Sequence, residues 1–445
     1  MERTNPLITD QQVSVCWFRR DLRLEDNHAF YRALVSGTAV LPIFIFDKQI
    51  LDQLNNPADR RVDFIFGALS QINRELAERW QSGVQIYYGL PVEVFEQLIA
   101  TYSIKAVYCN EDYEPYALER DQEVSRLLET RGVAFHSVKD QVIFHKEEIT
   151  KQDGSPYTVY TPYSRMWLAN FRAKAVESYP SEKHLDRLLR FTPDHFTLDR
   201  IGFNFTGTIF TLPVVDRSLI AHYDETRNLP GVERGVSRLS VHLRFGTLSI
   251  RSLVKVAEEW NETYLKELIW HEFFMQILYH FPHVEKRSFK SKYDLIRWDN
   301  NEEWFARWCE GTTGYPMVDA GMREFNETGF MHNRVRMVTA SFLTKHLLVD
   351  WRWGEAYFAS KLLDYDLSAD NGNWQWVSGS GCDAAPYFRI FNPEEQQKKF
   401  DPRWEYIRRW VPEVETNRYP KPMVDHKEAR QRTLERFKEA LNHEG

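Results

Sequence analysis

The sequence predicts an α/β domain followed by an all-α domain. Over the first 140 residues short apolar runs alternate with helical patterns, whereas from about residue 216 apolar residues recur at three- and four-residue spacings. A chain of 445 residues is also too long for a single core. We therefore expect an α/β domain over 12–140, a connector over 141–215 and a helical domain over 216–445.

Five apolar runs are predicted to form the strands of the first domain. They occupy 13–18, 39–46, 84–88, 106–109 and 134–138, and helical stretches near 27–36, 60–81, 92–102 and 115–131 separate them. Strand–helix alternation at this spacing predicts a Rossmann-like parallel sheet of five strands with helices on both faces. The turn after the first run, at 19–23, contains no Gly-x-Gly-x-x-Gly, so the sequence indicates no dinucleotide site there.

The remainder of the chain is predicted to be helical. The connector has a weak pattern with one helix around 162–178, and the region after residue 216 shows helical steps such as Leu265, Leu268, Ile269 and Phe273. Glycines at 246, 314, 329 and 354 divide these segments, and a last helix is expected over 425–442.

Composition narrows the class of protein. No window of about 18 apolar residues is present, and the start, residues 1–6, lacks the apolar core of a secretory signal, so we expect no membrane span. The four cysteines are scattered without metal-like spacing, which predicts reduced thiols in the cytoplasm and no metal site. The net charge of −7 argues against a generally basic nucleic-acid binder but leaves room for a local basic face.

The segment from 364 to 392 is the most informative part of the chain. It places Asp364, Asp366 and Asp370 at spacings of two and four, then two tryptophans one residue apart, then an arginine among aromatic residues. Acids are rarely buried without a partner, and a buried indole needs an acceptor for its N–H. The segment is therefore poor material for a plain core and favours a ligand site.

This segment closely resembles the flavin-binding signature of the cryptochrome/photolyase family. The resemblance runs from Val13 to about Pro412 and is closest to the bacterial class I enzymes that repair cyclobutane pyrimidine dimers. It implies FAD as cofactor, damaged DNA as partner and a carbon–carbon lyase reaction, in which excited reduced FAD passes an electron to a flipped-out dimer. A monomer is expected.

The resemblance implies a set of cofactor-binding residues: Tyr223, Val236, Ser237, Arg238, Leu239, Ser240, Asn333, Arg336, Asp364, Asp366 and Asp370. The run 237–240 looks like a helix N-terminus that would favour a diphosphate, although a plain N-cap explains it equally well. Val236 stands where many members of the family have Thr. An Asp364–Arg336 bridge between helices would also account for those two residues without a ligand.

Asp370 matches the position that faces the flavin N5, where bacterial photolyases usually have Asn and plant cryptochromes Asp. A carboxylate a few Å from an anionic reduced flavin would be repelled by about 4 kcal/mol at an effective dielectric of 20. We therefore expect a raised pKa for Asp370 when the flavin is reduced. A protonated carboxyl at this position could donate to N5, whereas Asn could not.

Two further groups of residues are implied by the resemblance. Trp374, Trp351 and Trp298 match the electron relay of the family, although each alone would also fit a packed core. The expected substrate residues include Glu267 and Trp270, three apart on one helix face, with Glu267 also expected to serve in catalysis. The complete expected substrate and DNA set is Arg227, Glu267, Trp270, Asn333, Arg334, Met337, Trp376 and Arg389.

Several alternatives stay open at this point. Enzymes that repair the (6-4) lesion use a pair of histidines, and here His332 is followed by Asn333, which disfavours that reaction. Asp370 favours a blue-light signalling cryptochrome with little or no repair, and a dark flavoprotein outside the family is a third possibility. A second, antenna chromophore is possible in the first domain. The Asn-Glu pair at 110–111 looks out of register with the folate-binding position of the family, which disfavours folate. A deazaflavin, a second flavin or an empty site stay open.

Overall fold

The computed structural model describes residues 11–54 and 56–442. The chain divides into two compact units: unit 1 comprises Met1–His145, Phe171–Val214 and Leu239–Lys255, and unit 2 comprises Lys146–Asn170, Val215–Arg238 and Val256–Gly445. The stretch expected as a connector is thus shared between the two units. The opening residues 1–6 and the last three residues of the expected helical domain lie outside the described residues.

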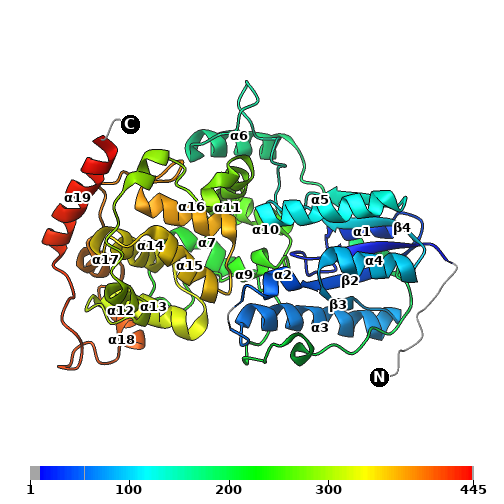
Figure 1. Ribbon diagram of the computed structural model, residues 1–445, viewed down its shortest axis with the longest axis horizontal. Coiled ribbons are helices and arrows are strands. Elements are labelled where there is room, and N and C mark those ends of the chain that lie inside the picture. The colour runs from blue at the N-terminus through cyan, green and yellow to red at the C-terminus, as the bar shows by residue number, and fades with distance from the viewer. Residues whose placement is uncertain (1–10, 55, 443–445) are drawn as a thin grey trace. The chain divides into compact units, whose positions relative to one another are not determined.

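Unit 1 contains a five-stranded parallel sheet (Figure 1), as predicted. Its strands are β1 (Val13–Phe18), β2 (Ala39–Asp47), β3 (Gln85–Gly89), β4 (Ile104–Asn110) and β5 (Ala134–Val138), in the order β3-β2-β1-β4-β5. Every residue of the central strand β1 is buried, which explains why its sequence is an unbroken apolar run apart from Ser14. The Ser14 hydroxyl is satisfied by Thr38 at 2.6 Å.

Helices accompany the strands of unit 1 at the predicted places. Asn27 caps the first of them by accepting a hydrogen bond from Phe30 N–H at 3.1 Å, and Asp59 caps the longest in the same way. The helical segments of this unit are α1 (His28–Leu34), α2 (Lys48–Leu51), α3 (Arg60–Trp80), α4 (Pro91–Thr101), α5 (Pro115–Thr130), η1 (Ser181–Arg187), η2 (Leu198–Ile201) and α9 (Ser240–Arg244).

Apart from one isolated bridge between Thr150 and Pro156, the regular secondary structure in the described residues of unit 2 is helical (Figure 1). Its helices are α7 (Arg217–Ala221), α8 (Tyr223–Thr226), α11 (Glu262–His280), η3 (Pro282–Glu285), η4 (Ser291–Leu295), α12 (Glu302–Glu310), α13 (Pro316–Thr328), α14 (Asn333–Ser341), the π-helical η5 (Phe342–His346), α15 (Trp351–Lys361), α16 (Leu367–Ser378), α17 (Pro393–Phe400), α18 (Glu405–Trp410) and α19 (His426–Asn442). Two more, α6 (Tyr160–Ala173) and α10 (Ile250–Trp260), begin in one unit and end in the other.

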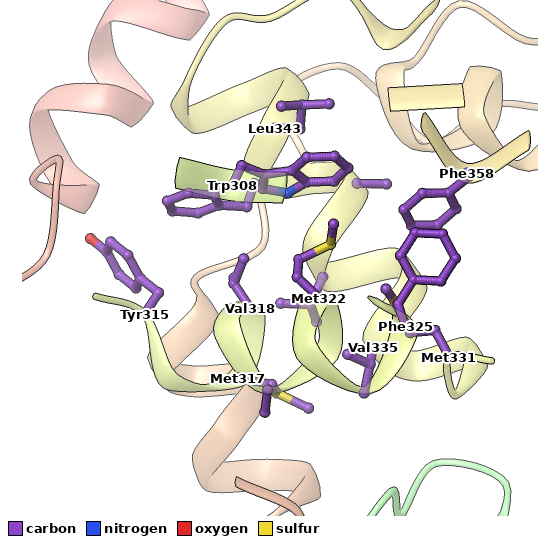
Figure 2. Packing of buried hydrophobic residues seen from close by; sticks show 14 of the residues in the cluster. Trp308, Tyr315, Met317, Val318, Met322, Phe325, Met331, Val335, Leu343 and Phe358 are labelled. Atoms are coloured by element: carbon purple, nitrogen blue, oxygen red, sulfur yellow. The ribbon is translucent and has the colours of Figure 1, made fainter. Parts of the chain in front are cut away.

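A large apolar cluster holds unit 2 together (Figure 2). Trp308 lies fully buried within it and donates its indole N–H to the carbonyl of Thr339 at 3.1 Å. Two glycines let neighbouring helices approach closely. A Cβ at Gly354 in α15 would lie 2.2 Å from the Trp374 ring of α16, and one at Gly372 in α16 would lie 2.1 Å from the Phe274 ring of α11. These contacts set the spacing of α11, α15 and α16.

No helix in the part of the chain that the structure describes is long and apolar enough to cross a membrane.

Candidate active site

Unit 2 contains a cavity of about 410 Å³, within the usual size of a ligand pocket. Helices α8, α11, α14, α15 and α16 contribute most of its lining. Twelve of the predicted site residues line it: Tyr223, Arg227, Glu267, Trp270, Asn333, Arg336, Met337, Asp364, Asp366, Asp370, Trp374 and Trp376. The structure therefore gathers side chains from positions 223 to 376 around one space.

The acidic residues of the cavity have different partners. Arg336 donates from Nη2 to both carboxylate oxygens of Asp364, at 3.0 and 2.9 Å. Asp366 is the N-cap of α16 and accepts hydrogen bonds from Ala369 N–H at 3.1 Å and from the Ser368 hydroxyl. Asp366 thus caps the start of α16, the helix that carries Asp370, Trp374 and Trp376.

Asp370 differs from the other two acids. Its Oδ2 atom is buried and has no hydrogen-bond partner within the described residues. Burial raises the pKa of Asp370 well above its ordinary value, the neighbouring Glu355 raises it further, and Arg336 opposes these effects. Burial, and after it the neighbouring carboxylates, therefore raise the Asp370 pKa in the protein alone, while the further rise expected beside a reduced flavin stays a prediction.

An unpartnered acceptor facing a cavity fits a ligand with N–H or O–H donors, such as the flavin ring edge and ribityl hydroxyls of FAD. Asp364 and Asp366 line the same space as Asp370. A phosphate group would be repelled there, so the donor-bearing part of the cofactor, and not its diphosphate, suits this end of the cavity. The residues present fit FAD in this respect.

Aromatic side chains supply much of the remaining lining. Trp270 comes from α11, whereas Trp374 and Trp376 come from α16, and all three line the cavity. The Phe274 ring lies 5.4 Å from that of Trp270 and is held against Gly372. Flat apolar walls of this kind suit a planar ligand or a nucleobase, because every base has a π-face.

Glu267 forms an ion pair with Arg227, with 2.7 Å between Oε1 and Nη1. Burial raises the pKa of Glu267, and Arg227 opposes that rise. The Arg227 guanidinium also lies over the ring of Tyr223, 5.3 Å from its centroid. These three residues form a connected polar group on the cavity lining, and a ligand base could hydrogen-bond to either charged member.

Three predicted DNA-contacting arginines come close together although they are far apart in sequence. The Arg334 guanidinium donates to the neutral side chain of Asn228, at 2.8 and 3.2 Å, and lies over Phe400. Burial lowers the pKa of Arg334, and the nearby positive charges of Arg227 and Arg389 lower it further. A cluster of like charges of this kind favours an anionic partner such as a phosphate.

The three tryptophans expected to form the relay are all associated with the apolar cluster of unit 2. Trp374 and Trp351 are buried, with 3% and 1% of their surface exposed, and Trp298 is partly buried. Only Trp374 lines the cavity. The Trp298 ring contacts Phe437 of α19 with a centroid distance of 5.9 Å.

The remaining predicted residues do not line the cavity: Val236, Ser237, Arg238, Leu239, Ser240, Arg334, Arg389, Trp298 and Trp351. The expected helix does begin at Ser240, but α9 is only five residues long and its N-cap Leu239 makes no side-chain cap hydrogen bond. Ser237 instead shares a hydrogen bond with the Tyr264 hydroxyl at 2.9 Å. Arg238 is an exposed cation over the Phe330 ring.

Sequence reasoning missed several lining residues, namely His271, Phe274, Ala340, Phe358, Leu362, Tyr365, Ala369, Asn373 and Val377. A helical-face argument could have found two of them. Asn373 lies three residues after Asp370, and Phe274 lies four after Trp270, so each shares a face with a predicted residue.

In unit 1 the carboxyl ends of β1 and β4 bear a charged network, at the position where open α/β sheets bind ligands. Arg20 pairs with Asp112 at 3.2 Å and with Glu114 at 2.9 Å. Arg19, beside it, pairs with Asp121 and lies 4.8 Å from the centre of the Trp17 ring. Any antenna chromophore bound at this edge would meet arginines that already have carboxylate partners.

Two family models match the chain. DNA photolyase matches residues 14–182, and the FAD binding domain of DNA photolyase matches residues 264–417, which contain most of the cavity lining. The deoxyribodipyrimidine photo-lyase of Vibrio cholerae is 37% identical, over 96% of this chain and 100% of its own length. This chain belongs to the DNA photolyase family. The predicted cofactor, FAD, is confirmed by the match to the family's FAD-binding domain.

Solved structures of photolyases support the fold. The bacterial class III photolyase from Agrobacterium tumefaciens is 29% identical and superposes with a TM-score of 0.83, over 97% of this chain and 98% of its own. The archaeal photolyase from Sulfolobus tokodaii is 33% identical with a TM-score of 0.80, over 96% and 99%. The latter was solved with two FAD molecules, with the implication of a novel light-harvesting cofactor. The predicted fold class is confirmed.

Proposed function

We propose that this photolyase family member is a deoxyribodipyrimidine photo-lyase, a light-driven enzyme that splits cyclobutane pyrimidine dimers in DNA. The observation that carries the proposal is the cavity of unit 2, which combines an acceptor-rich group of carboxylates with tryptophan walls. The arginine cluster of Arg227, Arg334 and Arg389 supports DNA as the partner. Relatives that are named for this activity match nearly the whole chain.

The cofactor site proposed here uses the residues predicted from the family resemblance. Asp364 and Asp366 would accept hydrogen bonds from the donor groups of FAD, and Arg336 would hold Asp364 in place. Asp370 would offer its unpartnered carboxyl to the same ligand. Asn333 at the start of α14 adds an amide to the same lining. The residues 236–240, with exposed Arg238, would serve the diphosphate. When bound and reduced, FAD supplies a light-driven one-electron transfer to and from the dimer.

The protein's own contribution is binding, orientation and exclusion of water. Photolyases are themselves standard examples of enzymes that extrude their target from the DNA stack. Trp270 and Trp376 would flank the extruded pyrimidines, since stacking is worth roughly 1–3 kcal/mol per base. Glu267, Asn333 and Met337 would contact the base edges. Glu267 is held by Arg227, so a base that bonds to Glu267 would compete with this ion pair.

Trp374, Trp351 and Trp298 would carry electrons from the surface toward the cavity. Burial of the first two excludes water from the path, and the partial exposure of Trp298 gives it access to an external reductant. We also expect the enzyme to act as a monomer in the cytoplasm, with the antenna region in 12–140 and the catalytic domain in 216–445.

Asp370 favours a second candidate function, a blue-light signalling cryptochrome. Burial raises the pKa of Asp370, and its Oδ2 has no partner in the described residues, so the protonated form of this side chain would offer a donor to a cofactor in the cavity. Nothing in this arrangement removes the substrate walls, so repair is the better supported function. Asp370→Asn removes the acid that favours signalling but keeps a polar side chain of similar size and leaves the tryptophan walls of the cavity intact.

A repair assay tests the proposal. Purified protein with reduced FAD is illuminated with blue light in the presence of an oligonucleotide that carries one thymine dimer, and restored thymine is measured. Light-dependent turnover is expected for wild type and for Asp370→Asn. Trp270→Ala with Trp376→Ala should lose affinity for the damaged strand. If wild-type protein in the light restores no more thymine than the dark control, the repair function is wrong and the photoreceptor candidate is favoured.

A further inference from the structure

Tyr160, the first residue of α6, stacks on Trp270. The two rings are parallel, with centroids 3.6 Å apart and an interplanar angle of 3°. The phenol donates a hydrogen bond to the carbonyl of Lys266 at 2.8 Å, and the backbone N–H donates to Asp383 Oδ2 at 3.0 Å. Because the residue is held at its ring, its hydroxyl and its backbone, it has little conformational freedom left.

The helix that carries Tyr160 is itself fixed to α11. Trp167 donates its indole N–H to Glu272 Oε1 at 2.7 Å, and the Tyr163 hydroxyl reaches the same oxygen at 3.3 Å. All three of these side chains are buried. Lys266, Trp270 and Glu272 belong to one helix, so α6 and α11 are joined both at the Tyr160 stack and beyond it.

Trp270 lines the cavity, whereas Tyr160 is not among the lining residues. The indole of Trp270 also meets the edge of Phe273 at 5.6 Å and 82°. Tyr160 therefore covers a face of the indole from behind the cavity wall. A stacking wall that is already ordered binds a base more tightly than one that must be ordered on binding. Any effect of Tyr160 on a ligand in the cavity passes through Trp270.

The backbone contact extends this arrangement to the second wall. Asp383 lies in the segment that follows α16, the helix that carries Trp376. The N–H of Tyr160 thus connects the start of α6 to the chain just beyond one wall, while its ring supports the other.

We propose that Tyr160 is a positioning residue for dimer recognition: its stack on Trp270 presets the aromatic wall against which the extruded pyrimidine dimer packs. This proposal rests on the proposed repair function. It adds a residue from the predicted connector to the substrate site.

Affinity for damaged DNA tests the proposal. Tyr160→Leu keeps apolar volume but cannot stack, and should weaken binding of a dimer-bearing duplex roughly threefold to tenfold, the effect of losing one aromatic pair. Affinity for undamaged duplex and the repair rate at saturating substrate should stay unchanged. Tyr160→Phe retains the ring and should restore dimer affinity. Asn170→Ala, which removes a side chain whose amide bonds to Met166 within the same helix, is the control and should bind like wild type.

A double-mutant cycle separates positioning from a general structural role. In a Trp270→Ala background, Tyr160→Leu should cause no further loss of dimer affinity, because the wall it supports is gone. Additive losses, or a Tyr160→Leu variant that binds the dimer like wild type, would overturn the positioning role. Loss of affinity for damaged and undamaged DNA alike would also overturn it. A wild-type protein without preference for the dimer would reject the repair function and this proposal together, and that result is visible before any variant is made.

Discussion

Glu355 offers the clearest test of the electrostatics behind the cavity. It is buried in α15 and accepts a hydrogen bond from the Asn371 amide at 3.0 Å. Burial raises its pKa to about 7, against the effects of the Asn371 hydrogen bond and of Arg352. In the folded protein the side chain therefore keeps its proton over a range in which the unfolded chain has lost it. Glu355→Gln replaces it with a side chain that is neutral in both states.

The magnitude follows from the pKa. A rise from 4.5 to about 7, at 1.36 kcal/mol per pKa unit, corresponds to about 3 kcal/mol. A raised carboxyl pKa means that the folded state binds more protons, so wild type loses this stability as the pH rises from about 4.5 to about 7. Relative to wild type, Glu355→Gln should therefore gain about 3 kcal/mol between pH 4 and pH 8.

The assay is thermal unfolding of both proteins at pH 4, 6 and 8, with equal FAD content. A gain of this size corresponds to about 6–12 °C in relative midpoint for a unit of roughly 150–250 residues. Glu413→Gln is a control of opposite sign. Burial raises the pKa of Glu413, but its hydrogen bonds and Arg323 lower that pKa overall. Glu413→Gln should therefore be less stable than wild type at neutral pH, and this difference in stability should shrink on acidification. A midpoint difference between wild type and Glu355→Gln that does not change with pH would refute the reasoning.

Three further predictions follow from the site. Arg336→Gln leaves Asp364 without its cation and should lower the free energy of unfolding by about 3 kcal/mol and reduce FAD retention. Adding Asp364→Asn to the same chain should restore stability but not FAD retention. Urea denaturation measures the stability, and flavin absorbance measures the retained FAD. Gly354→Ala places a methyl group against the Trp374 ring and should cost about 2 kcal/mol, measured by thermal unfolding, whereas a neutral result would mean that α15 and α16 are less tightly packed than described. Trp374→Phe should slow photoreduction of FAD strongly but spare repair by chemically pre-reduced protein, and normal photoreduction kinetics would contradict the relay.

Much of the fold could be read from local pattern. Each predicted strand of unit 1 overlaps an observed one, and the helix predicted at 60–81 is found at 60–80. Buried parallel strands require apolar runs, and helices require apolar residues every three or four positions, so both leave a signal within a dozen residues. The helix predicted at 162–178 is instead found at 160–173. Its first residue, Tyr160, lay outside the prediction and is the residue that stacks on Trp270.

Some of the cavity residues could be predicted from the sequence for a different reason. Asp364, Asp366, Asp370 and Trp374 lie within eleven residues of each other, so a short motif and its family resemblance were enough to group them. The partner of each could not be assigned by pattern alone. Asp364 bonds to Arg336, Asp366 caps its own helix, and Asp370 has an oxygen with no partner among the described side chains, although all three are the same residue type.

By itself the sequence determined the two kinds of domain, the composition of the site and the family to which the chain belongs. Only the tertiary structure decided that Tyr160 stacks on Trp270, that Arg334 lies near Arg227 and Arg389, and that Glu355 is buried enough to hold a proton. The physical reason is the separation along the sequence of the residues that each interaction joins. Periodicity and capping act within one helix or strand. Stacking, charge repulsion and desolvation depend on residues far apart in the sequence, such as Tyr160 and Trp270, which meet only when the helices pack.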